Sequence, residues 1–447
     1  MAQETHPQYD KYRSIWKKIR DVFEGEDVIK AAGKTYLPAK EVQEEVEYRN
    51  YLSRSNFLEV LSTTITANTG LATRKDPEIT LPDTLAENET FINQIKQLIQ
   101  DLITEILAVG RAGVLIEPVD GTDITIPPRY VIYQTEDIVN WGGFDTTPTG
   151  VILRDGEEYV ELAFGPEGYT VYFLDKDGER KISTFIDQES GEEFTGPMSI
   201  TPTLGANTLN EIPFTFFNVT DNKLPVQKPP SLPLVNMSLS YYRDSADYQN
   251  ALHLSASPTP IISGPNIDEK KLRAALEGRG IGSSRLIVLP KDSVADFLEF
   301  SGQGLSAQRQ ALKDKESLMR AMGASLFTED SQLSTETATS ARIRQGSQTS
   351  ILVNVIKTVE TGVEIILKQT ARWMGLSDDD VNVTLPKDIV DPKLTPQEVK
   401  EVIALYQANV ITHETLYNTI TQGEFIASTR TAEEERDEIE DENAIIE

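Results

Sequence analysis

The residue types that most often carry out catalysis are scarce in this sequence. Cysteine is absent, which excludes thiol nucleophiles, disulfides and cysteine-based zinc sites. The three histidines, His6, His253 and His413, are far apart and belong to different expected elements. His413 is followed by a glutamate but not by the second histidine of a zinc-protease helix. We therefore expect no metal site and no catalytic residues, and interpret the histidines as structural or surface side chains.

Three short segments have part of the spacing of a nucleotide or cation loop. Residues 33–35 (GKT) match the end of a phosphate-binding loop, but Val28 occupies the place of its first glycine. Residues 278–282 (GRGIG) lack the glycine spacing of a dinucleotide site, and residues 175–178 (DKDG) lack the distal glutamate of a calcium loop. We expect turns at these places, no cofactor and no enzymatic activity. A hydrolase using two of the many carboxylates is a weak alternative.

The charge of the chain restricts its partners. With 42 Lys and Arg against 71 Asp and Glu, the 447 residues carry a formal net charge of −29. A protein that binds DNA or anionic lipid tightly through counterion release is normally basic, so tight DNA-binding and lipid-binding proteins are disfavoured. A negative surface that lets DNA slide past it is compatible with this charge. The apolar stretch at 102–116 is too short to span a bilayer, and the N-terminal residues do not form a signal peptide, so we expect a protein made inside the cell.

The periodicity of apolar residues predicts an α+β protein. Short helices are expected in residues 1 to about 50, with Asp10 as a plausible cap. Helices are also expected over 42–68, ended by Gly70, and over 91–109, where Gly110 is a natural C-cap. Residues 113–220 read as a series of strands. After a proline-rich link, long helices are expected at 234–256, 305–322 and 337–374, with a polar loop at 323–335. A compact αβ insert is expected at 258–300, with strands at 261–262, 285–289 and 297–300 and a short helix at 268–276. Two capped helices begin near residues 395 and 412, and an acidic tail follows.

This order of elements resembles the portal, or head-to-tail connector, protein of tailed bacteriophages. The segments that carry the resemblance are 211–218 (EIPFTFFN), 232–253 (LPLVNMSLSYYRDSADYQNALH), 258–264 (PTPIISG), 286–290 (LIVLP), 298–302 (LEFSG), 315–324 (KESLMRAMGA), 336–340 (ETATS) and 403–416. None of them is a catalytic signature, so the resemblance depends on the collinear set. It covers about residues 40–435.

The resemblance implies a portal-like fold with a β-rich wing, a two-helix stem, a small αβ clip and a helical crown. The implied regions are N-terminal helices and wing at 1–230, stem helices at 231–257 and 305–323, clip at 258–304, tunnel loop and long wing helix at 324–390, crown at 391–436 and acidic tail at 437–447. No long coiled-coil barrel is expected after the crown, because helical periodicity ends near residue 436.

The resemblance also implies partners. About twelve subunits would form a ring at one vertex of the virion capsid, assembled in the host cytoplasm, with a channel for packaging and ejection of double-stranded DNA. The clip would dock the terminase large subunit and later the neck or tail adaptor proteins. The wing would contact the major capsid protein, and scaffold protein would assist assembly. No membrane partner is expected.

Candidate site residues follow from these regions. The basic residues of the second stem helix and the helix after it read either as solvated side chains paired with Asp314 and Glu316 or as a ring of positive charge around an axis. The channel candidates are Lys313, Lys315, Arg320, Arg342 and Arg344. The tunnel-loop candidates are Ser325, Thr328, Ser331 and Ser334. The clip candidates are Pro260, Asn266, Lys271 and Arg279.

Two other classes of protein fit part of the pattern. A neck adaptor or minor head protein would also form rings, but is usually shorter and lacks the order stem, clip, stem. A hydrolase would show turnover without assembly. The observation that separates these readings from a portal is whether the helices near 231–256 and 305–322 lie side by side.

Overall fold

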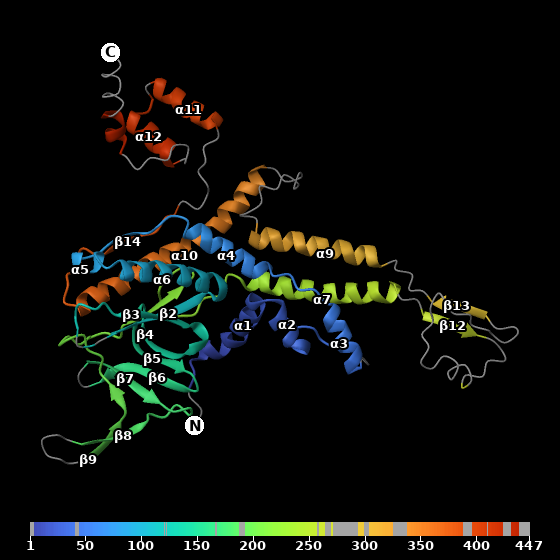
Figure 1. Cartoon of the computed structure of the whole chain (residues 1–447), viewed down its shortest axis with the longest axis horizontal. Coiled ribbons are helices and arrows are strands. Elements are labelled where there is room, and N and C mark those ends of the chain that lie inside the picture. Colours follow the sequence, from blue (N-terminus) through green and yellow to red (C-terminus); the bar gives the residue numbers. More distant parts are fainter. Residues whose placement is uncertain are drawn as a thin grey trace.

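The chain is an α+β protein in the computed structural model, which confirms the expected fold class (Figure 1). The structure describes residues 4–40, 44–119, 121, 123–165, 168–186, 193–256, 259–263, 270, 294–298, 304–324, 338–387, 396–408, 410–422 and 431–437. Helices α4, α6 and α10 lie together above the sheets in Figure 1, while α7 and α9 extend to one side.

The α-helices of the described residues range in length from 4 to 36 residues. They are α1 (Pro7–Glu24), α2 (Glu26–Ala31), α3 (Glu45–Arg54), α4 (Val60–Ala72), α5 (Asp83–Ala86), α6 (Glu89–Val109), α7 (Leu232–Ala256), α9 (Leu305–Met319), α10 (Ala338–Trp373), α11 (Pro396–Gln407) and α12 (His413–Gln422). A π-helical turn, Arg320–Ala324, continues α9. Within the described residues, no helix is both long enough and apolar enough to cross a membrane.

The strands form small antiparallel sheets. They are β1 (Glu78–Thr80), β2 (Arg111–Glu117), β3 (Arg129–Gln134), β4 (Ile138–Phe144), β5 (Thr147–Asp155), β6 (Glu158–Gly165), β7 (Gly168–Leu174), β8 (Ile182–Ile186), β9 (Glu193–Pro197), β10 (Ser199–Ile200), β11 (Phe214–Asn218), β12 (Thr259–Ser263), β13 (Val294–Leu298) and β14 (Asn382–Thr384). Five strands form the order β10-β7-β6-β5-β4, and three form β11-β2-β3. Strand pairs β1-β14, β8-β9 and β12-β13 complete the set.

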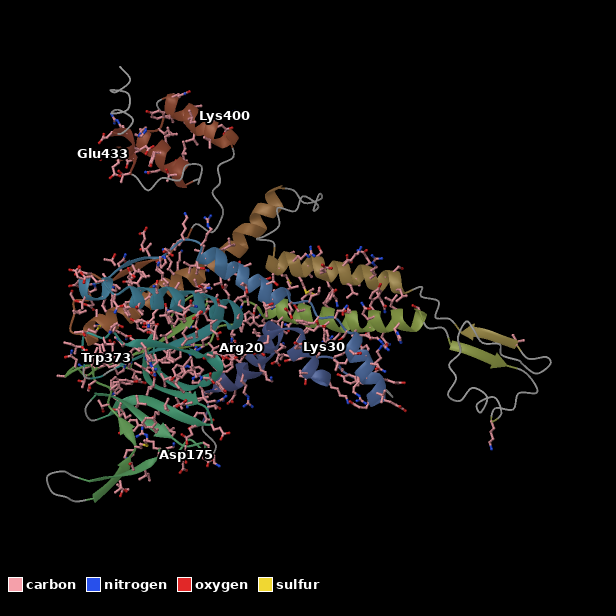
Figure 2. All side chains as sticks on the ribbon, viewed as in Figure 1. Arg20, Lys30, Asp175, Trp373, Lys400 and Glu433 are labelled. Atoms are coloured by element: carbon pink, nitrogen blue, oxygen red, sulfur yellow. The ribbon has the colours of Figure 1, made fainter. Side chains whose placement is uncertain are left out.

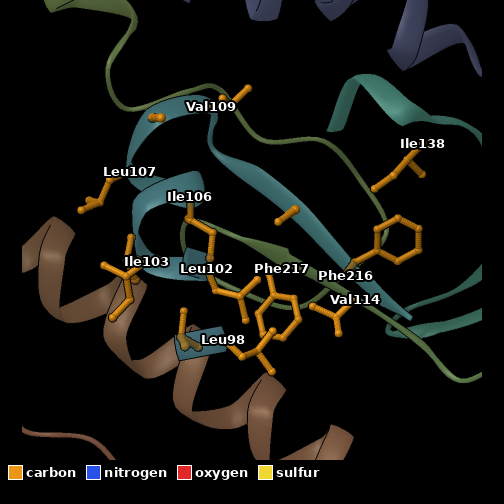
Figure 3. Packing of buried hydrophobic residues seen from close by; sticks show 14 of the residues in the cluster. Leu98, Leu102, Ile103, Ile106, Leu107, Val109, Val114, Ile138, Phe216 and Phe217 are labelled. Carbon is orange, nitrogen blue, oxygen red and sulfur yellow. The ribbon is translucent and has the colours of Figure 1, made fainter. Parts of the chain in front are cut away.

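The main core is built around α6 and the three-stranded sheet. The apolar face of α6, including Leu98, Leu102 and Ile106, is buried against β11 and α10 (Figure 3). Asn88 caps the start of α6 by accepting a hydrogen bond from the Phe91 amide, and Gly110 ends it at φ 85°. The C-cap glycine lets the chain turn directly into buried strand β2, as the sequence predicts.

Long helix α10 packs closely on β11 at a glycine. A Cβ atom added to Gly362 would lie 2.1 Å from Cε1 of Phe217 and 2.6 Å from Nδ2 of Asn222. Gly362 therefore serves close helix–sheet packing, and a larger side chain there would push the two layers apart.

The prediction of one helix over 42–68, ended by Gly70, is wrong. Helices α3 and α4 are separated, and Gly70 lies inside α4. In the link between them, the Ser55 hydroxyl donates to the Tyr242 hydroxyl at 3.1 Å, and Phe57 packs edge-on against the Tyr242 ring. These contacts with α7 hold the chain out of helical geometry, which local propensity cannot show.

Candidate functional site

Helices α7 and α9 form an antiparallel pair that extends from the body of the protein (Figure 1). Ser238 lies opposite Met319, with 3.6 Å between Oγ and Sδ, and Asp244 lies opposite Lys315. Residue numbers rise along α7 as they fall along α9, so the two helices run in opposite directions. With 25 residues, α7 is about 37 Å long. The helices expected at 231–256 and 305–322 therefore do lie side by side.

The body of the protein holds only the first part of α7. The Tyr51 hydroxyl donates to Asp247 at 2.8 Å, Lys40 pairs with the same carboxylate at 2.9 Å, and Arg243 Nε donates to the Tyr36 carbonyl at 3.0 Å. Burial, followed by the bond to Asp247, raises the pKa of Tyr51 above its ordinary value. Among the α7 side chains that the structure describes, none after Ala246 is buried. The rest of the helix projects with α9 as its neighbour.

The far end of the pair carries the two-stranded sheet β12-β13 (Figure 1). Pro260 lies opposite Phe297 in this sheet, and Ile261 lies opposite Asp296. The predicted strands at 261–262 and 297–300 thus correspond to β12 and β13, with β13 beginning and ending earlier than expected. The described residues include only residue 270 of the predicted helix at 268–276 and none of the predicted strand at 285–289. They also exclude the clip candidates Asn266, Lys271 and Arg279.

Helix α9 presents three parallel rows of side chains with the same spacing. Since an α-helix turns 100° per residue, the second and third rows lie about a quarter turn to either side of the first. The row toward α7, here called the contact row, contains Gln308, Leu312, Lys315 and Met319. The second row is called the basic row because it contains three cations and one acid: Arg309, Lys313, Glu316 and Arg320. The third is called the small row after its two alanines, and it contains Ala307, Ala311, Asp314 and Leu318. Leu312 and Met319 are the buried residues of α9, and the other two rows are mostly exposed.

The channel candidates on α9 have different surroundings. Lys315 belongs to the contact row and donates to Asp244 at 2.5 Å and to Ser240 at 2.8 Å, so it ties α9 to α7. Arg320 pairs with Glu316 at 2.7 Å, one of the pairings expected for solvated side chains. Lys313 is exposed and has no ion pair among the described residues.

The remaining candidates cannot be placed by side chain. Arg342 and Arg344 lie in α10, at positions whose side chains the structure does not describe. The tunnel-loop candidates Ser325, Thr328, Ser331 and Ser334 lie outside the described residues, so their role stays a prediction. No group of three or more His, Asp or Glu side chains arranged to hold a metal occurs in the described part of the chain.

A partly buried ion cluster joins α1 and α6. Arg20, which is labelled in Figure 2, donates to Glu105, with 2.8 Å between Nη1 and Oε2, and to Glu136, with 2.9 Å between Nε and Oε1. Burial raises the pKa of Glu105, while the Arg20 charge opposes that shift. Sequence reasoning missed this cluster, because the three residues are brought together only by tertiary packing.

A fully buried cation lies at the start of β2. Arg111 is fully buried between the rings of Trp141 and Phe216, at 4.5 and 4.4 Å from their centroids, and donates to the Leu224 carbonyl at 2.5 Å. Burial lowers its pKa to about 9. This residue holds the link between β11 and α7. Its sequence signal, an arginine between a helix-ending glycine and an apolar strand, is too weak to find it.

Comparisons with known proteins give a partial family match and loose structural neighbours. Residues 230–374 match a family described as a domain of unknown function (DUF4055), which is less than half of the chain. No curated protein matches the sequence significantly.

Three solved structures contain similar chains. One, from the virion of a native gene transfer agent (GTA) particle, is 10% identical with a TM-score of 0.43, covering 84% of this chain and 93% of that one. A chain from the neck of the empty GTA particle, computed with C6 symmetry, is 13% identical with a TM-score of 0.42, covering 82% of this chain and 92% of that one. A chain from the neck of the native GTA particle, computed with C12 symmetry, is 12% identical with a TM-score of 0.40, covering 84% of this chain and 93% of that one. At such identities and TM-scores, the functional argument rests on the geometry of this chain.

Proposed function

We propose that this chain is a portal subunit, which assembles into a ring at one vertex of a phage-like capsid and surrounds a channel for double-stranded DNA. The observation that carries the proposal is the projecting arm, in which α7 and α9 run antiparallel and end in the β12-β13 sheet. Among the described side chains of this arm, none of α7 after Ala246 and only Leu312 and Met319 of α9 are buried, so the arm gains support when neighbouring copies pack beside it. The β-rich region and α10 lie at its opposite end (Figure 1).

The exposed surface supports a subunit built for assembly. Several large apolar side chains of the described residues are exposed, among them Phe144, Ile182 and Leu318. A head-to-tail interface that closes into a ring would cover some of them. We infer about twelve copies, in keeping with the portal resemblance of the sequence.

The rows of α9 give the arm two different sides. We infer that the basic row, with Lys313 at its centre, lines the channel, and that the small row faces the next subunit. Short side chains let helices approach closely, and a few cations touching phosphates in an otherwise negative ring let DNA pass without tight binding. In this proposal Arg342 and Arg344 add to the channel charge, whereas Lys315 stabilises the arm.

The remaining parts take the roles that the resemblance implies. Residues 258–304 form the clip, which docks the terminase large subunit during packaging and the neck or tail adaptors afterwards. Residues 1–230 with α10 form the wing, which contacts the capsid and scaffold proteins, and residues 391–436 form the crown. Residues 323–335, with Ser325, Thr328, Ser331 and Ser334, form the tunnel loop. The role is structural, without catalysis.

The absence of cysteine allows a direct test of which row lines the channel. The variants Lys313→Cys and Ala311→Cys each carry one thiol, two residues apart on the same helix. After assembly, we expect a maleimide–gold label on Lys313→Cys to surround the central hole in electron micrographs. We expect Ala311→Cys to react with maleimide before assembly and to be protected in the ring. Gold on the outer circumference, or equal labelling of both variants after assembly, would contradict the proposal.

A further inference from the structure

A cavity of about 470 Å³ lies between the two larger sheets of the β-rich region. Strands β2 and β3 form one wall, through Leu115 and Tyr133, and strands β6 and β7 form the other, through Leu162 and Val171. Most of the lining is apolar, as expected where the inner faces of two sheets meet. The cavity is separate from α7 and α9.

Two tyrosine hydroxyls at this cavity lack hydrogen-bond partners. Tyr169 is only 2% exposed, and neither its hydroxyl nor that of Tyr133 bonds to another described residue. Burial, followed by the charges of Glu117 and Asp155, raises the pKa of Tyr133 to about 12. The pKa of Tyr169 is raised by burial and by Glu117. Each hydroxyl therefore has unused hydrogen-bonding capacity, and a ligand in the cavity that bonds to it would gain from that capacity.

The two carboxylates at the cavity differ in their pairing. Glu117 is paired with Arg129, at 2.9 Å to Nε and 2.6 Å to Nη2. Asp155 is exposed at the end of β5 and has no cationic partner among the described residues. The segment that supplies much of the lining, residues 151–200, contains twelve acids and four bases.

We propose that this cavity binds a lysine side chain presented by a partner protein. The apolar walls accept the four-carbon stem, and Asp155 with the hydroxyls of Tyr133 and Tyr169 accepts hydrogen bonds from the ammonium group, which has three donors and no acceptor. An anionic or purely apolar ligand would leave Asp155 unpaired. The net charge of −29 attracts a basic partner to this surface. The site does not depend on ring formation.

Ligand-observed saturation-transfer NMR tests the site on the full chain, with Nα-acetyl-lysine methylamide as the probe. We expect saturable binding in the millimolar range and about tenfold weaker binding of the norleucine analogue, which keeps the apolar stem but lacks the charge. Asp155→Asn should weaken lysine binding by a similar factor. Asp177→Asn, which makes the same change at an exposed turn away from the cavity, should leave it unchanged.

Tyr169→Phe separates binding from folding. Because the hydroxyl makes no bond within the described residues, its removal should leave the thermal midpoint unchanged or higher while weakening lysine binding. Equal binding of the lysine and norleucine probes, equal effects of Asp155→Asn and Asp177→Asn, or no saturation transfer at about 10 mM probe would overturn the assignment. Tighter binding of spermidine than of the lysine probe would also overturn it, because the site would then favour a free polyamine over a protein side chain.

Discussion

Truncating Met319 tests how the arm is held together. Its side chain is 0% exposed and belongs to the main core, whereas Leu312, the other buried residue of α9, is not part of that core. Met319→Ala should cost about 2–3 kcal/mol through lost burial and the cavity left behind. A 15-residue helix is marginal in isolation, so this cost should appear as local detachment of α9. Since 1.4 kcal/mol is a factor of ten, opening of α9 should become about 30–150 times more frequent.

Hydrogen exchange of the α9 amides, resolved by mass spectrometry, measures this opening directly. Met319→Ala should accelerate exchange in α9 by that factor, with much smaller changes in α6. Leu318→Ala is the matched control, because the adjacent side chain is 45% exposed and its loss should change exchange less than about twofold. Equal protection of α9 in both variants would refute the inference that the contact row docks this helix on α7.

Three further predictions concern the body of the protein. Burial lowers the pKa of His6, whose Nδ1 accepts a hydrogen bond at the start of α1, so the free energy of unfolding should fall as pH drops below about 6.5. The variant His6→Asn can cap the helix without titrating, so this part of the pH dependence should be absent from its urea titrations at pH 7 and pH 5. Gly362→Ala should destabilise the fold by about 1–3 kcal/mol through its clash with Phe217, whereas Gly70→Ala, with open space around its Cβ, should stabilise it by about 0.5–1 kcal/mol; equal thermal midpoints would contradict the packing. Arg20→Met should lower the free energy of unfolding by about 3–5 kcal/mol at pH 7, because it leaves two largely buried carboxylates unpaired. Part of that stability should be regained at pH 5, where the carboxylates can take up protons. A loss of stability that is the same at both pH values would contradict this role of Arg20.

Local signals predicted most of the elements. The apolar face of α6 and its glycine cap, the alternation in the β-rich region and the prolines before α7 each act within a few residues, so they can be recognised without tertiary information. The start of α1 shows the limit of such signals. Asp10 is a plausible cap by residue type, but Pro7 begins the helix and His6 caps it.

The arrangement within the site depends on contacts between distant segments. The bond between Lys315 and Asp244 depends on how α7 and α9 are aligned, and periodicity does not give the alignment of two helices. The burial of Arg111 between Trp141 and Phe216 likewise needs three strands to meet. Sequence therefore identified the basic residues of α9, whereas the structure was needed to separate the arm-stabilising lysine from the exposed Lys313.

The central claim is that this chain closes into a ring, and native mass spectrometry combined with negative-stain images of the purified protein tests it most directly. The account predicts particles of about twelve subunits with a central hole, formed by the chain alone or after addition of scaffold protein. A monomer that persists with scaffold present, at concentrations where the labelled cysteine variants also remain fully reactive, would contradict it.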